Sequence, residues 1–465
     1  MLNPATFSSE RYWLTNAHLP IALLNYSDPS IAEDQTREGL VLVNLAIQSG
    51  LIAEIQPATQ PISDAAPVID CCRGIVFPCF VDMHTHLDKG HIWERSPNLE
   101  GTFAYALNTV KADSQRYWDA EDVYRRMEFG LKCSYAHGTK AIRTHIDAMG
   151  EQAAISFDVF RSLQAEWQDR ITLQAVSLVP IDYFQTPEGE KLADRVASVN
   201  GVLGGLPQMN PALDTQLDRV FELAKERGLN LDFHTDESGN PEAITLRHVA
   251  KAALRHEFCG QIVCGHCCSL AVQSSVEVEK TLALVKQAGI GVVSLPMCNL
   301  YLQDRNQLAS HNWQTGTEAA ADSVSSPVPT QTPRWRGVTL IHELKHSGIP
   351  VAVASDNCRD PFYGFGDHDV LEVFTQSTRI AHFDAPYGNW CHTVTRTPAD
   401  LMGLSDSGRI EVGLPADLVL FKARYFSELL ARPQSDRIVL RNGKSIDTTL
   451  PDYAELDDLV HLGAD

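Results

Sequence analysis

The chain has 465 residues, of which 44% are hydrophobic and 21% are charged, and its formal net charge is −21 at pH 7. This composition supports a large folded core and excludes wholesale disorder. The negative charge repels phosphate backbones and anionic lipid, so we expect no nucleic acid and no membrane among the partners. No apolar run approaches the roughly 20 residues that cross a bilayer. Residues 1–10 lack the basic and apolar segments of a secretory signal.

The 11 cysteines do not have the spacing of a disulfide framework. Two pairs are adjacent in the sequence, Cys71-Cys72 and Cys267-Cys268, and several other cysteines lie in apolar stretches. We therefore expect buried, reduced thiols in a cytoplasmic protein.

Short apolar segments separated by turns make up residues 1–73. Residues 40–46 and 51–55 are apolar runs on either side of Gln48-Ser49-Gly50, which predicts a β-hairpin. We assign residues 1–73 to a small β-sandwich.

The other part of this sandwich is predicted from the C-terminal residues 401–465. Residues 416–421 and 436–440 have the pattern of strands, and Arg441-Asn442-Gly443-Lys444 has that of a tight turn. The two terminal segments would then enclose the rest of the chain as an inserted domain.

Residues 74–400 alternate apolar runs with stretches of helical periodicity. Such alternation predicts a parallel sheet covered by helices, and eight runs predict a (β/α)₈ TIM-like barrel with its chemistry at the carboxyl ends of the strands. The eight runs are residues 74–86, 139–147, 171–180, 201–207, 229–237, 261–268, 289–297 and 348–357. Residues 313–333, rich in Ser, Thr, Ala and Pro, are predicted to be a flexible insertion, either a lid or plain disorder.

Four of these runs end in residues that can bind a metal ion. The first ends in His84-Thr85-His86, and alternate residues of a strand point to the same side. The fifth run ends with His234, the sixth with His266 and the eighth with Asp356. Any one of them fits a hydrogen-bonded strand end, but four at one rim indicate a shared site.

Histidine and carboxylate ligands suit one divalent ion per chain, such as Zn²⁺ or Fe²⁺. Such an ion lowers the pKa of bound water to about 7 and so supplies hydroxide at neutral pH. Attack on an aromatic ring carbon also requires protonation of a ring nitrogen. Glu237, which lies just beyond His234, fits that task.

Five motifs together resemble the amidohydrolase superfamily, and specifically its bacterial cytosine deaminase group. They are His84-Thr85-His86, Arg143-Thr144-His145-Ile146-Asp147, His234-Thr235-Asp236-Glu237, Gly265-His266 and Ser355-Asp356-Asn357. The similarity runs from about Ile75 to Gly443. It implies the metal-dependent hydrolytic deamination of cytosine or of a related amino-substituted nitrogen heterocycle.

The resemblance also implies a role for each matching residue. The implied metal ligands are His84, His86, His234 and Asp356. The implied supporting residues behind these ligands are Arg143, His145 and Asp147. His266 would hydrogen-bond the attacking hydroxide, Asp356 would also accept the proton of the attacking water, and Glu237 would carry protons to the ring nitrogen and the leaving amine.

The residues that would read the substrate depart from the cytosine pattern. Pro180 stands where a glutamine reads the pyrimidine edge, Asn357 replaces a second aspartate, and Phe362 replaces a tryptophan. The expected pocket residues are Pro180, Asn357, Phe362, Asn299 and Asp182, with Gln208 as a further candidate. Cytosine or a close pyrimidine ranks first as substrate, and triazine-like or pterin-like rings are the alternatives.

Other readings of the motifs are open. The triazine-degrading N-isopropylammelide aminohydrolase shares several of them but lacks a counterpart of Glu237. A cyclic-amide hydrolase, such as dihydroorotase or hydantoinase, usually carries a carboxylated lysine at the end of its fourth strand, and residues 202–208 contain no lysine. A non-enzymatic scaffold would have eroded ligands, and none is missing. We expect a small heterocyclic substrate and a homo-oligomer, as in related barrels.

Overall fold

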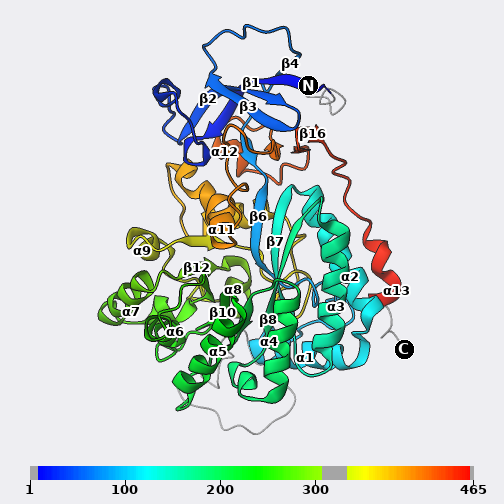
Figure 1. Ribbon diagram of the computed structural model, residues 1–465, viewed down its shortest axis with the longest axis vertical. Helices are drawn as coiled ribbons and strands as arrows, with labels where there is room; N and C mark the ends of the chain where they lie inside the picture. The colour runs from blue at the N-terminus through cyan, green and yellow to red at the C-terminus, as the bar shows by residue number, and fades with distance from the viewer. Residues whose placement is uncertain (1–8, 306–331, 461–465) are drawn as a thin grey trace, which may run out of the picture.

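The computed structural model describes residues 9–305 and 332–460. Residues 313–331 of the predicted insertion therefore lie outside the described residues. Two four-stranded sheets form a small β unit at one end of the molecule (top of Figure 1). The first has the order β3 (Leu51–Pro57), β2 (Leu40–Gln48), β1 (Arg11–Pro20) and β4 (Val68–Asp70). The second has the order β16 (Lys444–Ser445), β15 (Ile438–Arg441), β14 (Leu418–Leu420) and β5 (Val76–Pro78).

The two terminal segments meet in this β unit. Tyr12 and Leu14 of β1 belong to the same hydrophobic cluster as Leu418 of β14 and Leu440 of β15. The predicted hairpin is confirmed, because β2 and β3 pair antiparallel around a turn in which Ser49 has a φ of 52°. The shared core agrees with the predicted association of the termini, while the sandwich arrangement itself stays a prediction.

The predicted run at residues 74–86 is divided between two sheets. β5 pairs antiparallel with β14 of the β unit, whereas β6 (Phe80–Thr85) pairs parallel with β7 (Thr139–Asp147). A continuous apolar run does not show where a strand changes its partners, so the sequence could not predict this division.

Eight parallel strands follow one another in chain order, from β6 to β13. The three-stranded sheet consists of β6, β7 and β8 (Thr172–Leu178). The five-stranded sheet consists of β9 (Leu203–Gly205), β10 (Leu231–Thr235), β11 (Ile262–His266), β12 (Gly291–Ser294) and β13 (Val351–Val353). Isolated parallel bridges join the sheets, Val176–Val202 and Pro180–Leu206 on one side and Thr85–Asp356 on the other. This mixed α/β architecture is consistent with the TIM-barrel type, although the two sheets are linked by isolated bridges and not by a continuous ladder.

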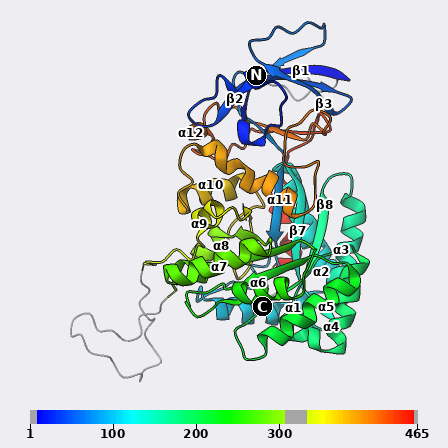
Figure 2. The ribbon, with the colours of Figure 1, turned by 60° about the vertical axis from the view of Figure 1, so that its left-hand side comes forward.

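Helices lie around the outside of these strands (Figures 1 and 2). They are α1 (Phe103–Tyr117), α2 (Ala120–Ala136), α3 (Gln152–Trp167), α4 (Pro187–Ser198), α5 (Leu213–Arg227), α6 (Thr245–Arg255), α7 (Ser275–Gln287), α8 (Pro296–Leu302), α9 (Ile341–His346) and α10 (Val370–Ile380). The remaining helices lie elsewhere: α11 (Arg396–Leu401) shares a hydrophobic cluster with the inner side chains of the strands, α12 (Phe426–Leu429) lies beside the β unit, and α13 (Asp457–Val460) packs on α2. Capping side chains start several of them. Asp119 accepts a hydrogen bond from the backbone N–H of Asp122 at the start of α2, and Ser274 accepts one from the backbone N–H of Glu277 at the start of α7.

One continuous hydrophobic cluster attaches the helices to the strands. Phe157 and Phe160 of α3, Phe221 of α5 and Phe233 of β10 are all fully buried in it. Deep packing on the outside of the strands leaves their carboxyl ends rigidly placed. Within the described part of the chain, no helix is long and apolar enough to cross a membrane.

Candidate metal centre and active site

The four predicted ligands lie together at the carboxyl ends of three strands. His86 Nε2 is 3.4 Å from His234 Nε2 and 3.2 Å from Asp356 Oδ1, and His84 Nε2 is 3.5 Å from the same carboxylate oxygen. Ligand atoms around one tetrahedral ion with bonds of about 2.0–2.1 Å are about 3.3 Å apart. The separations therefore match those of donors around a single ion.

Backbone hydrogen bonds between the first and the last strand hold this spacing. The N–H of His86 donates to the carbonyl of Asp356 at 3.2 Å, and the N–H of Asp356 donates to the carbonyl of His84 at 2.8 Å. Asp356 itself has a φ of 63°, in the left-handed region, which turns its carboxylate out of the strand direction.

The donor set fits a divalent ion by two further observations. Buried polar atoms normally have a hydrogen-bond partner, yet both ring nitrogens of His84 and Asp356 Oδ1 have none in the described structure. Burial also lowers the pKa of His84, His86 and His234 well below 6.5, so the imidazoles are neutral, as metal ligands must be. Burial raises the pKa of Asp356 to about 8, and the nearby Lys89 ammonium opposes this rise, as a bound cation would.

Glu237 and His266 lie beside each other next to the ligand cluster. His266 Nδ1 is 3.5 Å from Glu237 Oε1, and the side-chain amide of Asn299 joins them. Asn299 Nδ2 is 3.2 Å from Glu237 Oε1 and 3.0 Å from His266 Nδ1. An amide N–H can only donate, so His266 Nδ1 accepts and the ring proton is on Nε2, which has no partner among the described residues. His266 can therefore donate a hydrogen bond from Nε2.

Asn299 is a predicted pocket residue, and its Nδ2 group is engaged by these two residues, whereas its Oδ1 atom is buried and has no hydrogen-bond partner among the described residues. Replacing Asn299 with alanine removes both hydrogen bonds. A hydrogen bond between neutral groups contributes about 0.5–1.5 kcal/mol, and two such bonds contribute about 1–3 kcal/mol, so we expect kcat to fall by about 10–100-fold while the metal content is unchanged. Steady-state kinetics with elemental analysis tests this. A raised KM at wild-type kcat would instead show that Asn299 reads the substrate.

The three predicted supporting residues take different positions. The His145 ring lies 3.9 Å from the His84 ring, centroid to centroid, and both of its nitrogens are buried without a hydrogen-bond partner among the described residues, with Nε2 3.9 Å from Asp232 Oδ1. Arg143 Nη1 donates to Asp232 Oδ2 at 2.8 Å in a fully buried ion pair. Asp147 accepts from Lys89 Nζ at 3.4 Å. His145 thus packs against the ligand His84, whereas Arg143 pairs with Asp232 and Asp147 pairs with Lys89.

Lys89 is a residue of the site to which the sequence assigned no role. Its ammonium is buried and lies 4.9 Å from the centre of the Phe362 ring. Burial lowers the pKa of Lys89, but the carboxylates of Asp147 and Asp360 outweigh this effect and raise the pKa above its ordinary value. Lysine is rarely buried unless it is paired, so a lysine three residues after His86, at the end of a buried apolar strand, was the available signal.

The other predicted pocket residues divide into two groups. Asn357 and Phe362 are buried, and Asn357 Nδ2 donates to Asp360 Oδ2 at 2.7 Å. Pro180 and Asp182 are exposed, because β8 ends before them and the chain turns into a short 3₁₀ helix at Ile181–Gln185. Within the described ranges no hydrogen bond joins Pro180 or Asp182 to the ligand cluster. Gln208 is exposed as well.

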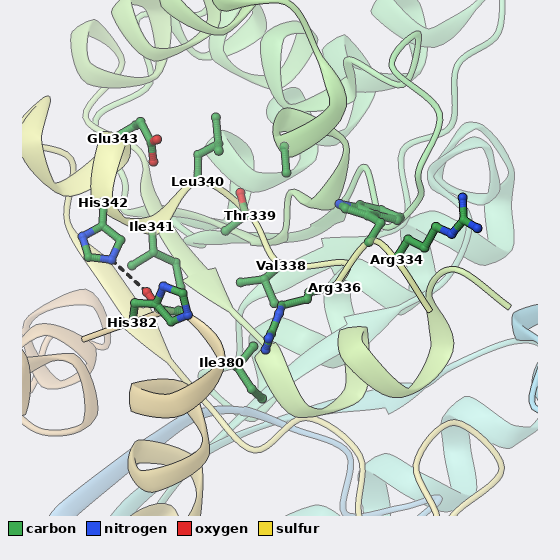
Figure 3. Close-up of a pocket in the computed structure, with 13 residues that line it drawn as sticks. Arg334, Arg336, Val338, Thr339, Leu340, Ile341, His342, Glu343, Ile380 and His382 are labelled. Carbon is green, nitrogen blue, oxygen red and sulfur yellow. Dashed lines mark hydrogen bonds between the residues drawn. The ribbon is translucent and has the colours of Figure 1, made fainter. Parts of the chain in front are cut away.

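A separate cavity of about 390 Å³ lies between the start of α9 and the end of α10 (Figure 3). Its wall includes Leu340, His342 and His382, and His342 Nε2 is 2.8 Å from the carbonyl oxygen of Ala381. None of the predicted site residues lines this cavity. The metal-ligand cluster, and not this surface cavity, is the candidate active site.

Comparisons with known proteins identify the family of the chain. A model of the amidohydrolase family matches residues 116–447. The chain is 47% identical to a pterin deaminase from Rhizobium rhizogenes, over 97% of this chain and 98% of that protein. It is 24% identical to an N-isopropylammelide isopropyl amidohydrolase from a Pseudomonas species, over 81% of this chain and 87% of that protein. The crystal structure of a 5-methylcytosine deaminase from Klebsiella pneumoniae has the same fold, with a TM-score of 0.76, 24% identity and coverage of 95% of this chain and 98% of the other. The chain belongs to the amidohydrolase family.

Proposed function

We propose that this protein is a metal-dependent aminohydrolase that removes the amino group of a pterin-like ring by hydrolysis. The observation that carries this proposal is the placement of Glu237 and His266 beside the cluster of three imidazoles and Asp356. The proposal includes the finer form of the fold, a (β/α)₈ barrel inserted into a β-sandwich, because in such barrels the chemistry lies at the carboxyl ends of the strands.

His84, His86, His234 and Asp356 would hold the ion. What a divalent ion supplies at such a site is activated water near neutral pH. In a pterin the amino group is attached to a carbon between two ring nitrogens. In the overall reaction a C–O bond forms at this carbon, the C–N bond to the amino group breaks, and ammonia leaves.

The chain's own residues carry the protons of this reaction. Burial and the neighbouring Asp356 raise the pKa of Glu237 well above 4.5, so its carboxyl group holds a proton where an ordinary glutamate would not. Glu237 can then protonate a ring nitrogen and, after regaining a proton, the leaving amine. Nε2–H of His266 can orient the reacting oxygen, since Asn299 keeps the other ring nitrogen as acceptor.

Two observations favour a pterin ring as the substrate over cytosine, the substrate that the sequence motifs favoured. The relative with 47% identity along almost the whole chain is a pterin deaminase. The departures at Pro180, Asn357 and Phe362 are also departures from the pattern that reads cytosine. Cytosine remains a second candidate because the order of the five motifs resembles that group.

The test of the substrate class is ammonia release from a panel of rings. The panel contains pterin, cytosine, 5-methylcytosine, isoguanine and an amino-triazine, and kcat/KM is measured for each. We expect kcat/KM for pterin to exceed that for the other rings by at least about 100-fold. A pocket that hydrogen-bonds one ring disfavours other rings, because they leave buried polar groups of the pocket without partners. An Asp356→Ala preparation, purified in parallel, excludes a contaminating deaminase.

Two results would contradict the proposal in different ways. A higher kcat/KM for cytosine than for pterin would keep the aminohydrolase and change its substrate. Release of ammonia from no ring, together with hydrolysis of dihydroorotate or hydantoin, would refute the aminohydrolase and leave the metal centre intact.

A further inference from the structure

A second group of metal-binding side chains lies apart from the active site. His91, Cys358 and His368 are all buried, and one donor atom of each lies within 4.8 Å of the others. This group shares no residue with the active-site cluster. Neither the predicted mechanism nor the proposed function uses it.

The two imidazoles of this group have the spacing of ligands. His91 Nε2 and His368 Nε2 are 3.2 Å apart, which is the spacing of the active-site donors and of two nitrogens on one ion with bonds of about 2.0–2.1 Å. A direct hydrogen bond between the two rings would be enough to explain the distance between them. It would not account for the thiol of Cys358 at the same point.

The backbone around this group has unusual features at three positions. His91 and His368 have φ values of 61° and 53°, in a region that few non-glycine residues occupy. Gly130 stands inside α2, where glycine weakens a helix, and a Cβ at this position would lie 2.9 Å from Leu87 Cδ2 and 3.0 Å from His368 Nε2. The absence of a side chain at Gly130 therefore leaves space for the His368 ring beside the helix.

The group sits where the loops after the first and the last parallel strand meet. The N–H of His91 donates to the carbonyl of Cys358 at 3.1 Å, and the N–H of Ile92 donates to the carbonyl of Arg359 at 2.9 Å. These loops follow directly on His86 and Asp356. An ion at this point would tie together the two segments that carry active-site ligands.

We propose that His91, Cys358 and His368 bind a second transition-metal ion, Zn²⁺ by the chemistry of the donors. Two imidazoles and one thiolate are soft to borderline ligands that select Zn²⁺ over Mg²⁺ or Ca²⁺. Three protein donors leave a further position to water. The ion has a structural role, to hold the loops after β6 and β13 together, and is distinct from the active-site ion.

Cobalt substitution tests this proposal independently of activity. The full-length protein is stripped with a chelator and reconstituted with two equivalents of Co²⁺. Only a thiolate ligand gives a sulfur-to-cobalt charge-transfer band in the near ultraviolet, and the active-site donors are nitrogen and oxygen. We expect the wild-type protein to bind two ions per chain and to show this band.

Variants assign the band to the site. Cys358→Ser and His368→Asn should each lose the band and one ion. His84→Ala should lose the other ion and keep the band, and Cys133→Ser, a buried thiol outside the group, should keep both. A wild-type protein without the band, or a Cys358→Ser variant that keeps it, would overturn the proposal. Because turnover is not measured, failure here is separate from failure of the proposed activity.

Discussion

Replacement of His84 by alanine is expected to abolish measurable turnover and to lower the metal content by one ion per chain. His84 has no hydrogen-bond partner on either ring nitrogen in the described structure and lies 3.5 Å from Asp356 Oδ1. Its removal leaves the ion with one ligand fewer. Elemental analysis and an ammonia assay measure the two losses.

A matched control distinguishes loss of a ligand from loss of the fold. His346 is an exposed histidine on α9, and His346→Ala should keep both ion content and turnover. Circular dichroism should be native for both variants. Full activity after thorough chelation, or a His84→Ala protein that retains its active-site ion, would contradict the assignment of the ligands.

Replacement of Glu237 by glutamine is expected to lower kcat by about 10²–10⁴-fold, the range of a general acid–base catalyst, with the metal content unchanged. Glutamine keeps the shape of the side chain and a hydrogen bond with Asn299, but it cannot give up and regain a proton. Burial and then the neighbouring Asp356 raise the pKa of Glu237 well above 4.5, so this carboxyl group keeps its proton to higher pH than an ordinary glutamate, and glutamine cannot replace that function.

The control for this variant is another glutamate on the surface. Glu279 is exposed on α7, and Glu279→Gln should be indistinguishable from the wild type in kcat. A Glu237→Gln enzyme as fast as the wild type would show that Glu237 serves only as a hydrogen-bonding group, and the proton carrier would have to be sought elsewhere.

The placement of the ligand residues could be anticipated from the sequence for a simple geometric reason. Parallel strands bring their carboxyl ends to one edge, so His234 and Asp356, far apart in the chain, end beside His84 and His86. The alternation of strands and helices from β6 to β13 followed from hydrophobic periodicity in the same way.

Other features depend on contacts that periodicity does not contain. Pro180 and Asp182 follow a strand end, yet both are exposed, because β8 ends at Leu178 and a short 3₁₀ helix begins at Ile181. The buried Lys89 is compensated by carboxylates from distant segments, Asp147 from β7 and Asp360 from beyond β13. Asn299 is directed at Glu237 by the short helix α8, whose orientation no local pattern indicated.

The bridge between Thr85 and Asp356 also bears on the order in which the protein becomes functional. Thr85 Oγ1 donates to the carbonyl of Asp356 across a sequence separation of 271 residues. A growing chain that has been synthesised only through β12 contains three of the four ligands, but it lacks the carboxylate and the backbone partners that hold His84 and His86 in place. Contacts of such long range form late and slowly. Capture of the active-site ion should therefore coincide with completion of the fold, and the ion should stabilise the finished protein without rescuing truncated chains.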